Sequence, residues 1–325
     1  MEVPYLDNVD RKILAELDLN ARESNSAIAK RLKLSKEVTS YRIRNLEKNG
    51  YIKGYYTVLN PSLLGVTYYR ILIKFYSLDV KTEKEVLSFL KDHRYVGWIA
   101  SCFGKYDLIG VIEVENAYQF DQFLYEFLSR YGKYIVEKEI TIFSSSIAFN
   151  KKFLTENYKT EVLEYIHQPK RISADEIDLK IIKDLSTSAR KPLIDIAKKL
   201  KLTPRAISER IKKLEKLGVL QGYRVSVDFS KLGYLYTHTL IKLENIQARQ
   251  KLMNFFKEHK ATLYGSFQVG AYDVSIESVV RNLEELNDFI QDMRVLFVKD
   301  IKNYDALILT KEYKLTYYPF EAFPI

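Results

Sequence analysis

The feature that most constrains the fold of this chain is an internal repeat at an offset of 168 residues. Residues 10–65 align with residues 178–233 without a gap, and 24 of the 56 aligned positions are identical. Unrelated sequences of ordinary composition would share roughly three or four. Landmarks persist further on, where residues 103–107 (FGKYD) match residues 269–273 (VGAYD). The chain is therefore one unit of about 150 residues used twice, which is too long a period for a solenoid repeat.

Each unit begins with the pattern of a helix-turn-helix. Asp7 is an N-cap candidate, and apolar residues follow it at helical spacing. A second short helix ends before Ser35, which is predicted to cap a third helix that stops at Gly50. The third helix is basic and polar on its outer face, which indicates a helix-turn-helix. The segments that follow in the two units, 51–59 and 219–227, are predicted to form a strand pair or wing.

The rest of each unit changes from helical to alternating periodicity. The pattern predicts the order β-α-β-β-α-β, which is a ferredoxin-like split βαβ arrangement, over residues 68–149 and again over 236–317. The expected fold class is α+β, with two winged helix-turn-helix domains alternating with two ferredoxin-like domains. The predicted boundaries are 1–60 and 173–228 for the helix-turn-helix domains, 61–150 and 229–325 for the βαββαβ domains, and 151–172 for a linker with a short helix.

Composition excludes several classes of protein. A single cysteine, Cys102, permits no intrachain disulfide and no thiolate zinc site, and four scattered histidines make a metal site improbable. Two of them, His93 and His259, fall at helix ends and are interpreted as structural, and Cys102 as a buried small hydrophobe. No catalytic motif has a fitting context, so neither a catalytic residue nor a cofactor is expected. The absence of a signal sequence and of an 18-residue apolar run predicts a cytoplasmic protein without a membrane partner.

The net charge of +9 is unevenly distributed. Residues 1–60 hold 11 lysines and arginines against 8 acids, and residues 169–228 hold 15 against 8. The remaining 205 residues are close to neutral, with 25 against 26. The excess positive charge thus lies in the two helix-turn-helix segments, which predicts double-stranded DNA as the partner.

At this point the sequence resembles a known family. The residues NAR, IAKRLKLS, RIRNLEKNGYIKGY and LLG, and their counterparts SAR, IAKKLKLTPRAISERIKKLEKLGVLQGY and KLG, are similar to the N-terminal half of the Lrp/AsnC (feast/famine) transcription regulators. The Gly-x-Tyr-Asp turns resemble the family's C-terminal βαββαβ domain, called RAM. The resemblance implies a sequence-specific DNA-binding transcription regulator that assembles as a homo-oligomer, although the tandem fusion departs from the usual single unit.

The DNA-contact hypotheses follow from position on the third helix. Residues near its start reach base edges in the major groove. In the first copy these are Lys36, Glu37, Ser40, Tyr41 and Arg44, and in the second Pro204, Arg205, Ser208, Glu209 and Lys212. Phosphate contacts are expected from Lys30, Arg31, Lys33, Lys198, Lys199 and Lys201. For Arg42 and Arg210, a phosphate contact and an ion pair on the helix surface are equally compatible with the sequence.

The two Gly-x-Tyr-Asp turns have a structural and a functional interpretation. A tight hairpin alone would account for each glycine, which supplies a positive φ, and for the aspartate, which caps locally. The resemblance implies instead that the turn borders an effector site between subunits, often for an amino acid. The candidate effector-binding residues are Gly104, Tyr106, Asp107, Gly270, Tyr272 and Asp273.

An enzyme on the same scaffold is the alternative function. Siroheme decarboxylases resemble this family, combine the same two domain types, and are in some cases fused in tandem. They carry a YNLWF-like run where this chain has GKYDLIGV and GAYDVSIE, and they need histidines in the pocket. The basic third helices favour DNA binding over this alternative.

Overall fold

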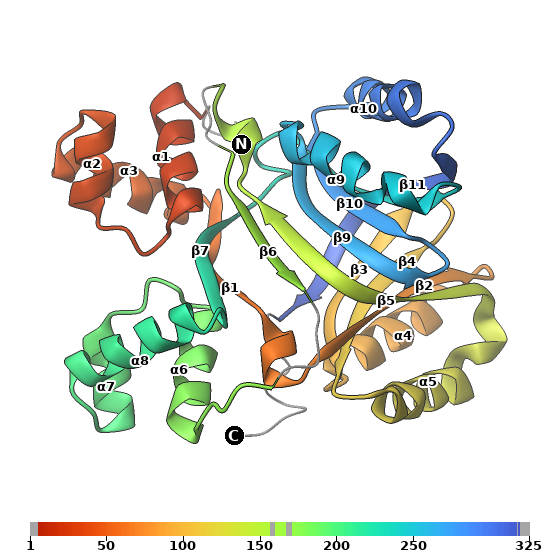
Figure 1. Ribbon diagram of the computed structural model, residues 1–325, viewed down its shortest axis with the longest axis horizontal. Helices are drawn as coiled ribbons and strands as arrows, with labels where there is room; N and C mark the ends of the chain where they lie inside the picture. Colours follow the sequence, from red (N-terminus) through yellow and green to blue (C-terminus); the bar gives the residue numbers. More distant parts are fainter. Residues whose placement is uncertain (1–5, 157–159, 167–170, 317, 319–325) are drawn as a thin grey trace.

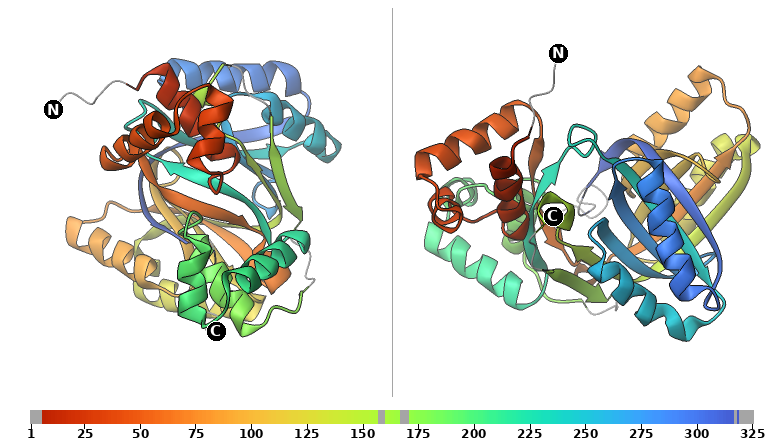
Figure 2. Two further views of the ribbon diagram at one scale, coloured as in Figure 1. Left: turned by 90° about the vertical axis from the view of Figure 1, so that its left-hand side faces the viewer. Right: turned by 90° about the horizontal axis from the view of Figure 1, so that it is seen from above.

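The structure, a computed structural model, describes residues 6–156, 160–166, 171–316 and 318. Two helix-turn-helix domains lie at one end of the molecule, and a large curved sheet with helices on its outer face forms the other end (Figure 1 and Figure 2). Within the described part of the chain, no helix is long and apolar enough to cross a membrane. The expected α+β class is confirmed.

The three helices of each helix-turn-helix form where the capping residues predict them. In the first copy, the side chains of Asp7, Ser24 and Ser35 accept hydrogen bonds from backbone N–H groups in the first turn of each helix. The helices are α1 (Asn8–Leu19), α2 (Asn25–Leu32) and α3 (Lys36–Lys48), and in the second copy α6 (Glu176–Ser186), α7 (Leu193–Leu200) and α8 (Pro204–Lys216).

The predicted strand pair forms between the two copies and not as a hairpin within one copy. Each segment after the third helix forms a single strand, β1 (Ile52–Leu59) or β7 (Leu220–Val227), and the two strands pair antiparallel with each other. The exchange extends to the cores: Val225 and Val227 of the second copy pack in the core of α1–α3, and Leu59 of the first copy packs in the core of α6–α8. The β1–β7 ribbon therefore joins the two helix-turn-helix domains into one body.

The predicted β-α-β-β-α-β order is confirmed in both units. The first unit contains β2 (Thr67–Phe75), α4 (Val80–Asp92), β3 (Val96–Phe103), β4 (Leu108–Val114), α5 (Ala117–Tyr131) and β5 (Ile135–Phe149). The second contains β8 (Leu235–Leu243), α9 (Arg249–Glu258), β9 (Thr262–Gly270), β10 (Val274–Val280), α10 (Leu283–Phe297) and β11 (Ile301–Leu315).

The two sheets close on each other. In each unit the order of strands places the last strand at one edge, and this long strand pairs with the other unit: β5 with β9, and β11 with β3. Together with the β2–β5 and β8–β11 pairs, these contacts complete a ring of eight antiparallel strands. We call this ring the barrel. Closure leaves neither sheet with a free edge inside the ring.

The segment predicted as a linker with a short helix contains a strand instead. In the described part of 151–172, Lys152–Leu154 form a 3₁₀ turn and β6 (Val162–Ile166) pairs antiparallel with the end of β5. The end of β5 extends beyond β2, so its backbone groups are available for a further partner. Residues 167–170, part of the expected connector, lie outside the described residues.

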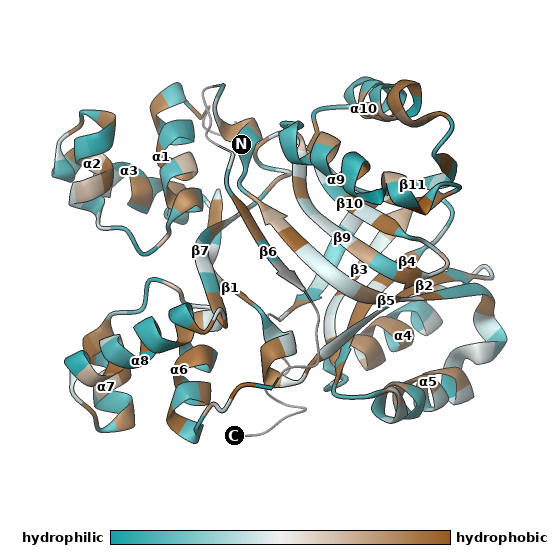
Figure 3. Ribbon diagram, in the orientation of Figure 1, coloured by the Kyte–Doolittle hydropathy of each residue, from teal (hydrophilic) through white to brown (hydrophobic). Residues whose placement is uncertain are grey.

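Alternation along the strands separates two apolar layers. Outward-facing residues such as Ile71 and Ile276 pack under α4 and α5, or under α9 and α10. Inward-facing residues, among them Leu72, Ile109 and Leu240, fill one end of the barrel. Figure 3 shows the corresponding mixture of hydrophobic and hydrophilic residues along strands and helices.

A buried ionic cluster fixes the first helix-turn-helix to both the connector and the second copy. Asp18, at the end of α1, accepts hydrogen bonds from the backbone N–H and the Nζ of Lys151, at 2.5 and 2.6 Å. Arg224 of β7 donates to the backbone carbonyl of Asp18 and lies 3.1 Å from Glu161. The side chains of Asp18, Lys151 and Arg224 are all at least nine-tenths buried, so each charge depends on the others.

Replacing Asp18 is expected to destabilise the fold strongly. In Asp18→Ala the buried Lys151 loses the carboxylate with which it pairs at 2.6 Å, Arg224 keeps Glu161 but loses the Asp18 carboxylate, and the free energy of unfolding should fall by about 3–5 kcal/mol. The matched control is Ser186→Ala at the equivalent position of α6, whose hydroxyl donates only to the carbonyl of Lys183, and which should cost at most about 1.5 kcal/mol. Urea denaturation checks both variants, and equal losses would contradict the role of the cluster.

Glu113 of β4 is expected to make stability depend on pH. Burial raises the pKa of this carboxyl from 4.5 to about 8. Between about pH 4.5 and pH 8 the unfolded chain ionises Glu113 while the folded chain keeps its proton, so stability falls as the pH rises through this window. In Glu113→Gln this loss should disappear. Denaturant unfolding at several pH values measures the difference between the two proteins, and a difference independent of pH would contradict the assignment.

Candidate nucleic-acid interface

The predicted base-reading residues of the first copy lie on the outer face of α3. Lys36, Glu37, Tyr41 and Arg44 are exposed, and Tyr41 is 60% exposed. Ser40 is half-buried, and its hydroxyl accepts a hydrogen bond from Nδ2 of Asn25 at 3.0 Å. The face of α3 that points away from the domain core is therefore available for a ligand.

The second copy presents a different set at the same place on α8. Pro204 occupies the first turn, Ser208 is half-buried, and Arg205, Glu209 and Lys212 are exposed. The Nε of Arg205 lies 3.0 Å from Oε1 of Glu209 one turn later, with 89% of the arginine side chain exposed. A pair this exposed contributes little to stability, so Arg205 can exchange Glu209 for another partner at low cost.

The turns between the second and third helices hold a lysine in a strained conformation. Lys33 and Lys201 have φ of 56° and 55°, and no other residue except glycine in the described ranges has a positive φ. A left-handed non-glycine residue costs roughly 1–2 kcal/mol. Lys33 is the C-cap of α2 and Lys201 is the C-cap of α7, and the backbone N–H of each is bonded to carbonyls of its helix. Both lysines are exposed beside the start of the third helix, α3 or α8, which we call the recognition helix.

The other predicted phosphate contacts fall into two groups. Lys30 and Lys198 are exposed on α2 and α7. The next residue in each copy, Arg31 or Lys199, already forms an ion pair with an acid of the preceding helix. Arg31 lies 2.5 Å from Glu16, and Lys199 lies 2.6 Å from Asp184. These two pairs brace the first helix against the second, and they remain partly exposed.

Arg42 and Arg210 form ion pairs between helices, one of the two alternatives that the sequence left open. Nη1 of Arg42 lies 2.7 Å from Asp7 and 2.9 Å from Asp10. Arg210 makes the equivalent pairs with Asp175 and Asp178 in the second copy. Each arginine ties the recognition helix to the N-terminal turn of the first helix, and the hydrogen bonds to these acids raise its pKa. The ion-pair alternative is therefore present in the structure, and a phosphate contact of either arginine stays a prediction.

The two recognition helices are held in a fixed relation to each other. Tyr55 of β1 donates to Glu47 of α3, and Tyr223 of β7 donates to Glu215 of α8, both at 2.6 Å. Across the repeat, the N–H of Ala21 donates to the carbonyl of Tyr223. Equivalent bonds on the other side link Ala189 to Tyr55. Both helix-turn-helix domains are thus hydrogen-bonded to the same β1–β7 ribbon, and they lie at the same end of the molecule (Figure 2).

The Gly-x-Tyr-Asp turns lie at the junction of the two sheets. Gly104 and Gly270 have φ of 135° and 134°, a region that favours glycine. The hydroxyls of the buried Tyr106 and Tyr272 are 2.9 Å apart, so the two turns meet across the repeat. Asp107 accepts from the backbone N–H of Phe75, at 2.9 Å, and from Lys74.

Asp273 repeats this pattern with the backbone N–H of Leu243 and with Lys242. Both aspartates thus bind strand ends inside their own unit. This arrangement agrees with the structural interpretation of the turns, and the effector role of the six turn residues stays a prediction.

The lone cysteine and two of the histidines have structural surroundings. Burial raises the pKa of Cys102 to about 12, which makes its thiol unreactive. His93 and His259 each accept a backbone N–H two residues on, from Tyr95 and Ala261, at 3.2 Å. Sequence reasoning overlooked His238, which is fully buried inside the barrel near Trp98; a lone histidine in an alternating strand gives no local signal of such a place.

Comparison with known proteins agrees with this geometry. Residues 6–53 match the family model described as winged helix-turn-helix DNA-binding, and residues 175–215 match the AsnC-type helix-turn-helix domain. An uncharacterised HTH-type transcriptional regulator of Pyrococcus furiosus is 34% identical over 140 residues, which are 40% of this chain and 85% of that protein. The HTH-type transcriptional regulator FL11 of Pyrococcus abyssi is 32% identical over 148 residues, covering 45% of this chain and 95% of FL11.

Solved structures of one protein match both units together. The siroheme decarboxylase NirDL, in complex with an iron-uroporphyrin III analogue, superimposes with a TM-score of 0.64 over 98% of this chain and 96% of that chain, at 15% identity. At this identity the likeness shows the shared tandem fold alone. The family follows from the sequence matches: this chain belongs to the Lrp/AsnC family of HTH-type transcriptional regulators, as a tandem duplication of the family's unit.

Proposed function

We propose that the chain is a sequence-specific DNA-binding transcription regulator in which one polypeptide supplies a pair of recognition helices. The observation that carries this proposal is the exposure of two different, basic third helices at one end of a single body. The Arg/Lys side chains at the helix starts suit guanine, and the lysines of the preceding turns suit phosphates. The ribbon fixes the two helices relative to each other before DNA is bound, which lowers the ordering cost of binding.

Pairing within one chain is supported by charge complementarity. Asp18 of α1 packs near Arg224 of β7, whereas the equivalent positions of the repeat are Ser186 of α6 and Tyr56 of β1. If like copies paired between two chains, α6 would bring Ser186 to Arg224, and the buried arginine would lose the Asp18 carboxylate. Arg224 would then keep its ion pair with Glu161, at 3.1 Å, and the loss of a second carboxylate beside a buried cation favours the unlike pairing. The chain then acts as a pseudo-dimer.

Assembly between chains and an effector are further parts of this proposal. Phe103 and Val269, beside the two Gly-x-Tyr-Asp turns, are 71% and 62% exposed. Exposed apolar side chains at equivalent places support a contact between copies of the chain. An amino acid bound beside these turns would connect assembly to effector concentration.

An enzyme is the second candidate function, because the fold of both units together resembles a siroheme decarboxylase. The test is direct: the purified protein is mixed with iron-uroporphyrin III and its absorbance spectrum is recorded. A shifted band at equimolar protein supports the enzyme candidate, and an unchanged spectrum supports the regulator.

DNA affinity is expected to fall steeply with salt. Because several lysines and arginines displace counterions from phosphates, affinity should drop by about 10²–10⁴ between 50 and 200 mM salt. Lys33→Gln should reduce the slope of log affinity against log salt by about one, whereas Lys84→Gln, on the distant α4, should leave it unchanged. Fluorescence anisotropy with a labelled duplex measures both slopes, and flat binding across this range would rule out the proposed contacts.

The preferred operator is expected to be asymmetric. Glu37 of α3 and Arg205 of α8 occupy equivalent positions of the repeat, so two half-sites roughly 10 base pairs apart should differ in sequence. Arg205→Ala should relax preference in one half-site only, at a cost of about 1–3 kcal/mol if the arginine reads guanine. Glu37→Ala, the matched variant, should alter only the other half. Selection from a random DNA pool decides, and a palindrome relaxed in both halves by Arg205→Ala would refute pairing within the chain.

A further inference from the structure

The barrel contains a cavity that has no role in the proposed DNA contacts or in the proposed effector site at the Gly-x-Tyr-Asp turns. Its volume is about 650 Å³, and its walls come from the inner faces of both sheets and from the β1–β7 ribbon. Eight-stranded barrels commonly have room for one small ligand. The volume is in the range of sites for organic molecules much larger than a free amino acid.

The walls carry many aromatic rings. The ring-bearing residues include Tyr56, Tyr68, Trp98, Phe143, Tyr236 and Tyr264, joined by aliphatic residues such as Val58 and Val111. Lining of this kind favours a ligand with an apolar body and only a few polar groups.

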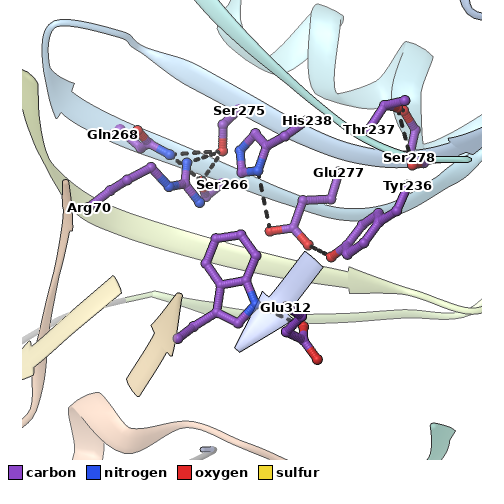
Figure 4. A network of polar contacts seen from close by, with 11 residues as sticks. Arg70, Tyr236, Thr237, His238, Ser266, Gln268, Ser275, Glu277, Ser278 and Glu312 are labelled. Atoms are coloured by element: carbon purple, nitrogen blue, oxygen red, sulfur yellow. Dashed lines mark hydrogen bonds and ion pairs between the residues drawn. The ribbon is translucent and has the colours of Figure 1, made fainter. Parts of the chain in front are cut away.

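Arg70 of β2 brings a buried positive charge into this cavity, where Glu277 is the carboxyl group that interacts with it electrostatically. Its side chain is 2% exposed, and its Nη1 donates to the hydroxyl of Ser275 at 2.6 Å (Figure 4). The guanidinium lies 4.6 Å from the ring centre of Phe143, and its Nε has no hydrogen-bond partner. Among the described residues, no carboxylate lies within 4 Å of Arg70 to pair with it. Burial lowers the pKa of Arg70 only to about 10, so the group stays charged at neutral pH.

Burial disfavours the ionised form of the nearby carboxyl groups, and Arg70 opposes this effect at Glu277. Oε1 of Glu277 lies 3.9 Å from Nδ1 of His238, and its other oxygen accepts from the hydroxyl of Tyr236. Oε2 of Glu113 is buried without a partner. Burial raises the pKa of both glutamates, and burial together with Arg70 lowers the pKa of His238. A negative group of a ligand placed against Arg70 would therefore supply the ion pair that this guanidinium does not make with the described residues.

A belt of small polar residues holds the arginine in place. The amide of Gln268 donates to the hydroxyls of Ser266 and Ser275 at 2.7 and 2.8 Å, and Thr141 donates to the amide oxygen of Gln268. These bonds span β5, β9 and β10, so Arg70 of one unit is anchored by the other. A preorganised guanidinium beside an apolar space is suited to a carboxylate.

We propose that the barrel cavity binds an aromatic carboxylic acid, with the carboxylate on Arg70 and the ring among Trp98, Phe143 and Tyr236. The site lies inside the pseudo-dimer and is separate from the turns discussed above. Since β1 and β7 form one wall and also carry the recognition helices, a bound ligand alters the spacing of these helices; this part rests on the proposed DNA-binding function.

The chain contains one tryptophan, Trp98, which lies in the cavity wall with its Nε1 donating to Glu312 at 2.9 Å. Its fluorescence therefore reports on this site alone. The full chain is titrated with 4-phenylbutyrate, 4-phenylbutyramide and 4-phenylbutylamine, which share one apolar body and carry a negative, a neutral and a positive group. The carboxylate should bind at least about tenfold more tightly than the amide, and the amine most weakly.

Two variants separate the charge from the space. Arg70→Gln should remove the preference for the carboxylate over the amide, whereas Arg130→Gln, on the outer helix α5, should keep it. Because a change at Arg70 can disturb folding, Val111→Phe keeps the arginine and fills the cavity, and it should weaken all three probes. Thermal unfolding followed by circular dichroism shows that each variant is folded.

Equal affinity for the carboxylate and the amide, or tighter binding of the amine, would overturn the site, and so would the absence of a saturable change in fluorescence. DNA affinity with and without 4-phenylbutyrate tests the coupling separately. A change of at least about threefold supports it, and an unchanged DNA affinity overturns the coupling while the site stands. If the proposed DNA-binding function is wrong, the protein fails to bind DNA even without 4-phenylbutyrate. Failure of the proposed function is therefore distinguishable from failure of the coupling.

Discussion

The structure of this chain depends on finding hydrogen-bond partners for the backbone N–H and C=O groups at the edges of its sheets. A four-stranded βαββαβ sheet leaves N–H and C=O groups unpaired at each edge, and an exposed edge invites uncontrolled pairing. Here the long edge strands β5 and β11 pair with β9 and β3 of the other unit, and the same solution recurs where β1 pairs with β7. Closure of the barrel, the cavity inside it and the fixed relation of the recognition helices all depend on these pairings between the two copies.

Duplication within one chain has allowed the two halves to diverge where they meet. In an assembly of identical units every position faces a symmetry-related copy of itself or its neighbours. In this chain Asp18 faces Arg224, while the equivalent positions hold a serine, Ser186, and a tyrosine, Tyr56. The same freedom separates Glu37 from Arg205 on the recognition helices and places Arg70 of one unit against Ser275 of the other. Buried charge thus distinguishes the two copies in the interior, and exposed charge distinguishes them at the DNA-binding end.

The two functional regions differ in how well the local sequence predicts them. The DNA-binding end is visible in the sequence because capping residues, helix-ending glycines and clustered lysines lie within short segments. The barrel site is not, because Arg70, His238 and Glu277 come from three strands and two units, and each is an isolated polar residue in an alternating pattern. Periodicity indicates which face such a residue is on, but it does not identify what lies opposite.

The duplicated unit, the order of helices and strands, and the helix caps at Asp7, Ser35 and their counterparts are all predictable from the amino-acid sequence. These features depend on interactions within a few residues, which periodicity and capping chemistry describe. Only the tertiary structure decided the partners over long distances: the exchange of β1 and β7, the strand β6 in the expected linker, and the choice of Arg42 and Arg210 for carboxylates. Backbone edges and side-chain charges have many candidate partners along the chain, and the selection follows from which pairings can be satisfied together in one packed body.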